Sequence, residues 1–289
     1  MPELPEVETV VRELAPEIKG SKVVRISVLQ PKLRKTIPDL SFLHGEKILS
    51  VKRRAKYILI QFQTGNLISH LGMTGKWVWR NPEEEQKHDH VKIDIETERG
   101  LRKTLVYNDV RRFGLLFWEP QGKEGEWRKA LGPEPLEKWN VEDLIKVLSK
   151  TKTAIKKAIM DNRTVVGVGN IYASEALYMA KIHPEKPSQE LTKDEAVRLH
   201  STIISVLEKG IRAKGASIRN YRRTEDNEGE MNLELHVYGQ KGKQCPEPYC
   251  NDVVTSKILG GRSTFWCPSC QALPTNTNTN TNTNNKDKT

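Results

Sequence analysis

Long apolar runs are absent from this 289-residue sequence. No stretch approaches the roughly 20 apolar residues that a transmembrane helix needs. The N-terminus also lacks the positively charged region and apolar stretch of a secretory signal, because it carries Glu3, Glu6, Glu8, Glu13 and Glu17 instead. From these absences we expect a soluble, intracellular protein.

Cysteine is absent everywhere except in one short segment near the C-terminus. That segment holds all four cysteines, Cys245, Cys250, Cys267 and Cys270. In a reducing compartment, such a cluster favours metal binding over disulfide bonds. Two closely spaced cysteine pairs suit a tetrahedral zinc ion, and four thiolates leave no open position for water. The segment therefore predicts one structural zinc ion per chain.

Acidic residues are too few to balance the basic ones. The chain has 47 Lys and Arg against 37 Asp and Glu, a formal net charge of +10. This excess favours a polyanionic partner, either nucleic acid or a membrane surface. A merely basic soluble protein is equally compatible with composition alone. The chain length can support two domains, and a hydrophobic content of 36% is enough for real cores.

The first residues carry an unusual chemical possibility. If Met1 is removed, Pro2 exposes a secondary amine directly before the carboxylate of Glu3. An α-amino group has an unperturbed pKa of ~8, so part of it is unprotonated and nucleophilic at neutral pH. Attack on a carbon such as C1′ of a sugar would give a positively charged iminium, with Glu3 placed to shuttle protons. The simpler alternative is that Pro2 and Pro5 only begin a helix with an apolar face.

Residues 22 to about 118 predict β structure. Short apolar or alternating runs are separated there by turn signals, a spacing that suggests an antiparallel sandwich. The expected strands are Lys22–Gln30, Glu46–Lys52, Lys56–Phe62, Asn66–Leu71, Val91–Thr97, Lys103–Asn108 and Gly114–Glu119.

After a Gly- and Pro-rich stretch at about 120–137, the pattern becomes helical. Helices are expected after Asn140, around Ala154–Met160, from Ile171 to about Ala180, and after the capping box Thr192–Glu195. We therefore divide the chain into an N-terminal domain (1–128), a helical domain (129–232), a cysteine module (233–273) and an Asn/Thr-rich tail (274–289). The tail is expected to be disordered, because it cannot form a core.

Two loops of the β region could form a wedge that enters a DNA duplex. The segment Asp109–Gly114 carries two arginines and Phe113, and the segment His70–Met73 ends in another large apolar side chain. Phe113 and Met73 could insert while Arg111 satisfies a base left without its partner. Taken alone, Phe113 and Met73 would more often be core residues.

Three other segments could contact phosphate groups. Gly167–Asn170 offers backbone N–H groups at a helix start, Arg53–Lys56 could follow a nucleic-acid backbone, and Arg262 lies between the two cysteine pairs, where a hairpin would expose it. Each also has a plainer interpretation: a helical corner, a solvated strand end and a solvated arginine.

Together these segments resemble the bacterial formamidopyrimidine-DNA glycosylase family, from residue 1 to about 272. The resemblance implies an α+β multidomain fold, in which an N-terminal antiparallel β-sandwich with an N-terminal helix is followed by a helix–two-turn–helix domain and a C-terminal zinc-finger hairpin. The motifs that carry it are Pro2–Glu8, Arg53–Tyr57, His70–Met73, Lys87–Val91, Arg111–Gly114, Leu131–Leu136, Gly167–Glu175 and Gly261–Phe265.

The resemblance also implies a reaction. It is that of a bifunctional DNA glycosylase and AP lyase in base excision repair, excising oxidised purines such as formamidopyrimidines and 8-oxoguanine opposite cytosine. Pro2 would form the Schiff base, and Glu3 would assist base loss and sugar-ring opening. Lys56 would donate protons and contact phosphate during β-elimination, and Arg262 would bind phosphates and assist δ-elimination.

DNA contacts are implied as well. Met73, Arg111 and Phe113 would fill the gap left by the flipped base, with Arg111 addressing the orphaned cytosine. The other residues expected to hold phosphates or lie near the lesion are His70, His88, Lys156 and Asn170. The loop around 215–231 would close over the damaged base. The partner is double-stranded DNA with oxidised bases or abasic sites, bound by a monomer in the bacterial cytoplasm, at the nucleoid.

The sequence departs from the family pattern in three places. Val110 stands where the family usually has proline, the first cysteine pair has four intervening residues rather than two, and the Asn/Thr tail has no counterpart. Two other hypotheses stay open: the same chemistry on oxidised pyrimidines, as in the endonuclease VIII branch, and a non-catalytic binder of damaged DNA. The Leu4-Pro5 opening and Arg111–Phe113 favour the purine branch, and a pure binder gives no reason for the Pro2 and Lys56 motifs to occur together.

Overall fold

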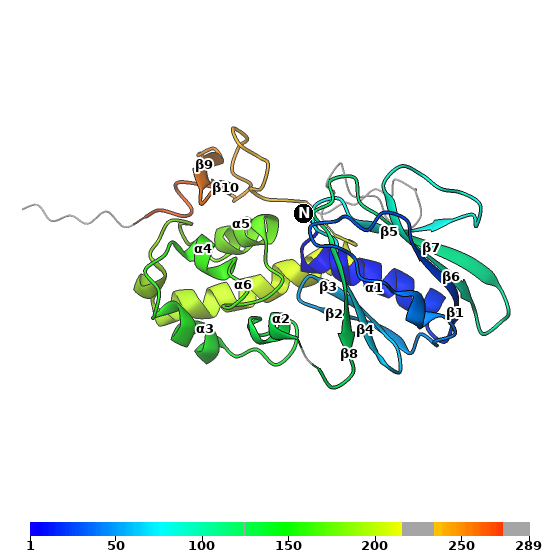
Figure 1. The fold of residues 1–289 in the computed structure, drawn as a ribbon. Helices are drawn as coiled ribbons and strands as arrows, with labels where there is room; N and C mark the ends of the chain where they lie inside the picture. The colour runs from blue at the N-terminus through cyan, green and yellow to red at the C-terminus, as the bar shows by residue number, and fades with distance from the viewer. Residues whose placement is uncertain (124, 216–233, 274–289) are drawn as a thin grey trace, which may run out of the picture.

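The computed structural model describes residues 1–123, 125–215 and 234–273, which form two lobes and a hairpin module (Figure 1). The sandwich lobe holds the first eight strands, and the helical lobe holds the longer helices that follow them. Within the described residues, no helix is long and apolar enough to cross a membrane. The predicted tail, and nearly all of the loop expected to close over the base, lie outside the described residues.

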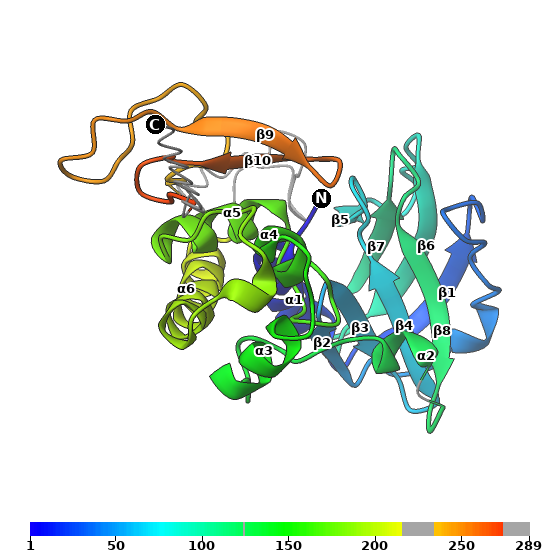
Figure 2. The same ribbon diagram turned by 90° about the vertical axis from the view of Figure 1, so that its left-hand side faces the viewer.

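The first helix, α1 (Leu4–Ile18), joins the two lobes. Val7, Val10, Val11 and Leu14 are buried in the core of the sandwich lobe, which confirms the helical spacing expected of them. Leu4, at the start of the helix, belongs instead to the core of the helical lobe. The N-terminus therefore lies where the two lobes meet (Figures 1 and 2).

The sandwich lobe consists of two four-stranded antiparallel sheets, as predicted. One sheet has the order β1-β6-β7-β5 and the other β2-β3-β4-β8, and residues of both sheets fill one core between them. The strands are β1 (Lys22–Val28), β2 (Ser50–Arg54), β3 (Tyr57–Gln61), β4 (Gly65–His70), β5 (Lys76–Arg80), β6 (Asp89–Glu96), β7 (Arg102–Asn108) and β8 (Leu115–Pro120), with a short 3-10 helix, η1 (Ser41–Leu43), after β1.

Strand β5 was not predicted. Its sequence, Lys-Trp-Val-Trp-Arg, is too short for a clear period, and the neighbouring residues Trp77 and Val78 are both buried. A burial pattern without alternation gives no signal of period two, so only pairing with β7 defines this strand.

The helical lobe follows the expected pattern closely. Its elements are α3 (Val141–Leu148), α4 (Ile155–Ile159), α5 (Asn170–Met179), η2 (Ser188–Glu190) and α6 (Lys193–Arg212), preceded by the short α2 (Glu126–Lys129), which was not predicted. Thr192 forms the expected capping box, accepting the Glu195 N–H at 3.2 Å and donating its own N–H to the Glu195 carboxylate at 2.8 Å. Asn140 precedes α3, but its side chain makes no capping bond.

The C-terminal module is a hairpin that lies over α4 and α5 (Figure 2). Its strands are β9 (Thr255–Leu259) and β10 (Arg262–Trp266). Gly260 and Gly261 connect them with φ angles of +58° and +74°, the left-handed conformations that a tight two-residue hairpin turn requires. Arg262 directly follows the turn, and β10 begins at the end of the hairpin nearest the N-terminus (Figure 2).

Candidate active site

The carboxylate of Glu3 crosses from α1 to the helical lobe and caps α5. It accepts the backbone N–H groups of Gly169 at 2.8 Å, Ile171 at 3.0 Å and Tyr172 at 3.4 Å. These are among the amides that a helix N-terminus leaves without partners, and the helix dipole favours an anion there. Of the amides expected to bind phosphate, that of Gly169 is therefore held by the protein's own Glu3.

The glycines before α5 make room for this contact. A Cβ atom on Gly169 would lie 2.2 Å from Cδ of Glu3, and one on Gly167 would lie 2.5 Å from Cδ1 of Leu4. Gly167 also has a φ of +85° and accepts the Leu4 N–H at 3.0 Å. The turn is thus shaped around the first residues of the chain.

Lys56 completes a buried pair of opposite charges. It is 7% exposed, and its Nζ donates to the carbonyl of Val168 at 3.1 Å, in the same turn that receives Glu3. Burial raises the pKa of Glu3, an effect that Lys56 opposes, and burial lowers the pKa of Lys56, an effect that Glu3 opposes. Each group is moved towards the range in which proton transfer at neutral pH becomes easy.

Pro2 is buried directly beside this pair. In the chain that retains Met1, burial lowers the pKa of the Met1 amine, with Glu3 and Glu6 opposing the shift and Lys56 and Arg111 adding to it. The amine therefore lies within the fields of both Lys56 and Arg111. Removal of Met1 would transfer the amine to Pro2, one residue closer to Glu3.

The hairpin module is fastened to the helical lobe by Lys156 and Asn170. Nζ of Lys156 donates to Oδ1 of Asn170 at 2.6 Å, to Oγ1 of Thr264 at 2.8 Å and to the carbonyl of Ser263 at 3.2 Å. The Asn170 amide donates to the same Ser263 carbonyl at 2.9 Å. Burial lowers the pKa of Lys156 to about 8. Both residues, expected at phosphates or the lesion, thus also connect the helices to the hairpin.

Arg262 is exposed at the tip of this hairpin. Its charge helps to lower the pKa values of both Lys56 and Lys156. An exposed guanidinium this close to two buried lysines adds to a concentrated positive field, which suits phosphate groups.

The expected wedge residues lie on the surface. Met73 is 36% and Phe113 46% exposed, so the alternative that they are core residues is wrong. The Arg111 guanidinium lies 5.0 Å from the centre of the Phe113 ring, a cation–π distance. The structure brings Arg111 and Phe113 together on one loop, and Met73 lies on the loop beside it.

The two predicted histidines differ in their surroundings. Nδ1 of His70 accepts the Gly72 N–H at 3.0 Å, and burial lowers the pKa of His70 to about 4, so the ring is neutral at neutral pH. His88 adopts a φ of +75°, and within the described part of the chain its buried Nδ1 has no hydrogen-bond partner. A free nitrogen in a strained residue beside the wedge loops is suited to an incoming ligand.

The four cysteines converge on one point. All four sulfur atoms lie within 4.8 Å of one another, with 3.7 Å between Cys245 and Cys270 and 3.6 Å between Cys250 and Cys267. A tetrahedron with zinc–sulfur bonds of about 2.3 Å separates its sulfurs by about 3.8 Å, so the donor set fits zinc. The longer first pair is accommodated in part by Tyr249, which has a φ of +64°.

Two buried glutamates that brace the site were not predicted. Glu134 accepts hydrogen bonds from the Arg53 and Arg54 guanidinium groups at 2.7 and 2.8 Å and from the Ala55 N–H at 2.5 Å, next to Lys56. Glu175, on α5, holds the chain that leads into the cysteine module, accepting from three consecutive N–H groups, those of residues 236–238. Both lie in segments that the family resemblance includes, but no periodicity or spacing marks a glutamate as a structural brace.

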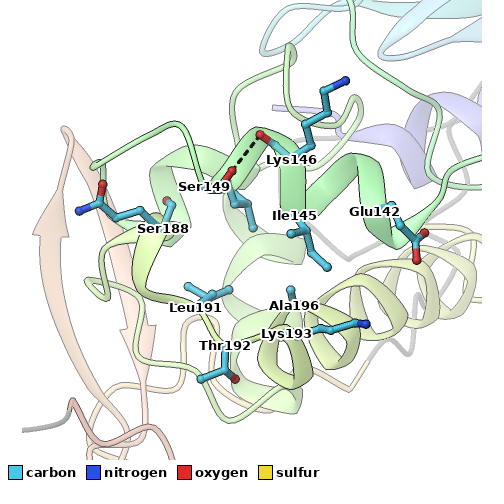
Figure 3. A pocket seen from close by; sticks show the side chains of 11 residues that line it. Glu142, Ile145, Lys146, Ser149, Ser188, Leu191, Thr192, Lys193 and Ala196 are labelled. Carbon is cyan, nitrogen blue, oxygen red and sulfur yellow. Dashed lines mark hydrogen bonds between the residues drawn. The ribbon is translucent and has the colours of Figure 1, made fainter.

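A cavity away from this cluster lies between α3 and the start of α6 (Figure 3). It has a volume of about 420 Å³, and its lining includes the apolar side chains of Ile145, Leu148 and Leu191 and the basic residues Lys146 and Lys193. None of the predicted site residues lines it, so the cavity contributes nothing to the candidate active site.

Comparison with known proteins gives a consistent result. The formamidopyrimidine-DNA glycosylase N-terminal domain matches residues 1–116, and the H2TH domain of the same family matches residues 131–222. The Haemophilus ducreyi formamidopyrimidine-DNA glycosylase is 42% identical over 279 residues, covering 95% of this chain and 100% of that protein. The Haemophilus influenzae one is 42% identical over 275 residues, covering 94% and 99%.

Solved structures agree in fold. A Lactococcus lactis Fpg variant in complex with DNA containing Fapy-dG superimposes with a TM-score of 0.85 at 35% identity, covering 94% of this chain and 100% of that one. The Lactococcus lactis Fpg in complex with DNA containing an abasic site gives a TM-score of 0.84 at 34% identity, with the same coverage.

Proposed function

The chain belongs to the formamidopyrimidine-DNA glycosylase family, and on that premise we propose how its residues divide the work of excising an oxidised purine and cutting the strand. The protein is a DNA glycosylase of base excision repair, and AP lyase activity is typical of its family. The observation that carries the proposal is the buried Glu3–Lys56 pair, which lies next to Pro2 where the two lobes meet.

The reaction begins at the Pro2 nitrogen, once Met1 has been removed. This nitrogen bonds to C1′ of the damaged nucleotide as the bond to the base breaks, and the base leaves with the electron pair and takes up the proton that the nitrogen releases. Glu3 donates a proton to the sugar-ring oxygen, whose bond to C1′ opens to leave the iminium. The raised pKa of Glu3 supports this role, because burial makes it easier for the carboxyl group to take up and pass on a proton.

Strand cleavage follows from the iminium. Loss of a proton from C2′ expels the 3′ phosphate, loss of a proton from C4′ expels the 5′ phosphate, and water finally releases the sugar remnant. Lys56 transfers protons in the first step, and its lowered pKa supports that role. Arg262, at the hairpin tip, stabilises the departing phosphates.

DNA binding uses the wedge and the positive field. Met73 and Phe113 enter the duplex, and Arg111 addresses the cytosine left behind when the base is flipped, at a cost of a few kcal/mol of stacking and pairing. His70, His88, Lys156 and Asn170 hold phosphates or lie near the lesion. The Fapy-dG in one Lactococcus lactis complex supports a purine lesion as substrate, and the abasic site in another supports a substrate for strand cleavage. We place the enzyme with the nucleoid in the bacterial cytoplasm, where such DNA lies.

Borohydride trapping tests this function. A duplex with 8-oxoguanine opposite cytosine and a duplex with thymine glycol are each incubated with the protein under reduction, which converts the iminium into a stable adduct. We expect an adduct on the 8-oxoguanine duplex. A preference for thymine glycol would move the protein to the pyrimidine branch, and DNA binding with no adduct on either duplex, by protein shown to lack Met1, would leave the non-catalytic binder.

We also propose that the cysteine site holds one zinc ion, whose bonds cross-link the hairpin module. The sulfur spacing and the small core around Cys245 and Cys267 support this, because little else in the module is buried. Elemental analysis of protein purified without chelator should give about one zinc per chain. Chelation should weaken DNA binding, since Arg262 would lose its fixed position, and protein with no metal but full activity would contradict the proposal.

We also propose that the chain is divided after residues 128, 232 and 273. The matches at residues 1–116 and 131–222 support a division near 128, with the cysteine module as a separate unit from about 233.

A further inference from the structure

The wedge is made of two loops that come from different parts of the sandwich lobe. Residues 71–75 connect β4 to β5 and carry Met73, and residues 109–114 connect β7 to β8 and carry Arg111 and Phe113. Each loop crosses from one sheet to the other. A wedge that enters DNA needs the two loops in a fixed position relative to each other. No strand pairing joins the loops there.

A single hydroxyl group supplies the connection. Oγ1 of Thr74 donates to Oδ1 of Asp109 at 2.5 Å and accepts the backbone N–H of Arg111 at 3.0 Å. The second carboxylate oxygen of Asp109 accepts the N–H of Gly114 at 2.8 Å. The residue after Met73 is therefore bonded to the beginning of the Arg111 loop, and Asp109 bonds to its end.

The surroundings leave these bonds little freedom. Asp109 is fully buried, and its carbonyl lies 3.0 Å from Nε2 of His90. The loops also touch through their backbones, since a Cβ atom on Gly72 would lie 2.4 Å from the carbonyl carbon of Phe113. Only a side chain that both donates and accepts within a short reach can serve at position 74, and a hydroxyl does both.

We propose that Thr74 is a specificity-determining positioning residue. Its hydroxyl fixes the backbone of Arg111 relative to Met73, so that the wedge enters the duplex as one unit and the guanidinium reaches the base opposite the lesion in one geometry. The inference rests on the proposed function, in which Arg111 addresses that base. Without the hydroxyl, the amide and the buried carboxylate lose their partners and the two loops shift independently.

The test compares Thr74→Val with Thr74→Ser. Valine keeps the shape of the side chain and removes the hydroxyl, whereas serine keeps the hydroxyl. For each protein, kcat/KM is measured on 8-oxoguanine opposite cytosine and opposite adenine. Borohydride trapping is measured on a single-stranded abasic oligonucleotide, which has no opposite base and needs no wedge.

We expect the preference for cytosine to fall about tenfold in Thr74→Val, as for a lost bond to a charged group, with trapping on the single strand unchanged. Thr74→Ser should keep the wild-type preference. Asp109→Asn should reproduce the valine result, because a carboxamide has one acceptor oxygen and cannot serve both Thr74 and Gly114.

Two results would overturn the inference. An unchanged preference for cytosine over adenine in Thr74→Val would show that the hydroxyl does not set how Arg111 meets the base opposite the lesion. Equal losses on the duplexes and on the single strand would show that Thr74 only supports the fold. If the wild-type protein itself neither released 8-oxoguanine from the duplexes nor was trapped on the single strand, the proposed function would fail first, and this inference with it.

Discussion

The two regions that would meet DNA are built in opposite ways. The cluster around Glu3 and Lys56 is buried, and its partners come from the N-terminus, the sandwich lobe and the helical lobe. The wedge of Met73, Arg111 and Phe113 is exposed, and its supports come from the sandwich lobe alone. The chemical steps therefore depend on how the two lobes pack, whereas recognition of the base opposite the lesion depends on two loops of the sandwich lobe. A substitution in one region should therefore impair its function and leave the function of the other region intact.

The largest effect is expected at Glu3. In Glu3→Gln, the carboxamide cannot donate the proton that opens the sugar ring, so the rate of 8-oxoguanine release should fall about 10²- to 10⁴-fold. The measurement is single-turnover base release from a duplex. Discrimination between opposite cytosine and adenine should persist in the residual activity, because the wedge is untouched. A release rate close to that of the wild type would remove Glu3 from the mechanism.

A smaller loss of stability and of base release is expected from a substitution at Gly169. Its φ of −124° is open to any residue, but the added Cβ atom of Gly169→Ala would lie 2.2 Å from Cδ of Glu3. The carboxylate must then leave the start of α5, so we expect a loss of about 1–3 kcal/mol in the free energy of unfolding, typical of overpacking, together with slower base release.

Gly239→Ala is the matched control for that variant. Nothing lies within 4 Å of its added Cβ atom, although its φ of +76° strains any side chain. It should lose some stability without losing base release. If Gly169→Ala kept wild-type base release, the contact between Glu3 and α5 would not be needed for the chemistry.

The smallest effect is expected in the pH dependence of the free energy of unfolding, through Lys156. Burial lowers the pKa of Lys156 from 10.5 to about 8, so between these values the unfolded chain holds a proton that the folded chain has released. The free energy of unfolding should therefore rise with pH in this window, by about 1 kcal/mol from pH 7 to pH 9. Urea denaturation at both pH values, in the wild type and in Lys156→Met, isolates the contribution. An equal pH dependence in the two proteins would contradict the lowered pKa of the buried Lys156 ammonium.

Much of the fold was accessible from the sequence, because it depends on local patterns. The apolar spacing from Val7 to Leu14 and the capping box at Thr192 specify their helices almost alone. Strand β5 and helix α2 could not be predicted, since each has only a few residues and is defined by what it packs against. The Trp127 ring of α2, for example, lies 4.6 Å from that of Tyr57 and donates to Glu119 on β8.

The site shows the same division. Side chains with distinctive chemistry, such as Pro2, Arg262 and the cysteines, could be named from the sequence. The contacts around the site could not be named: Glu3 with the amides before and within α5, Glu134 with Ala55, and Thr74 with Arg111 join residues that are 37 to 169 positions apart. No periodicity within a segment reports a hydrogen bond to a distant one. Only the packed structure shows that the Gly169 amide, in the turn before α5, binds the carboxylate of Glu3.

The central claim is that the terminal amine, and not a lysine, attacks the sugar. Lys56 and Lys156 are the competing candidates, because burial lowers the pKa of both and so makes both better nucleophiles. The direct measurement is peptide mapping by mass spectrometry of the adduct trapped by borohydride. The account predicts that the reduced sugar remnant is attached to the nitrogen of Pro2, in a peptide that lacks Met1. A remnant on the Nζ of Lys56 or Lys156 would contradict it.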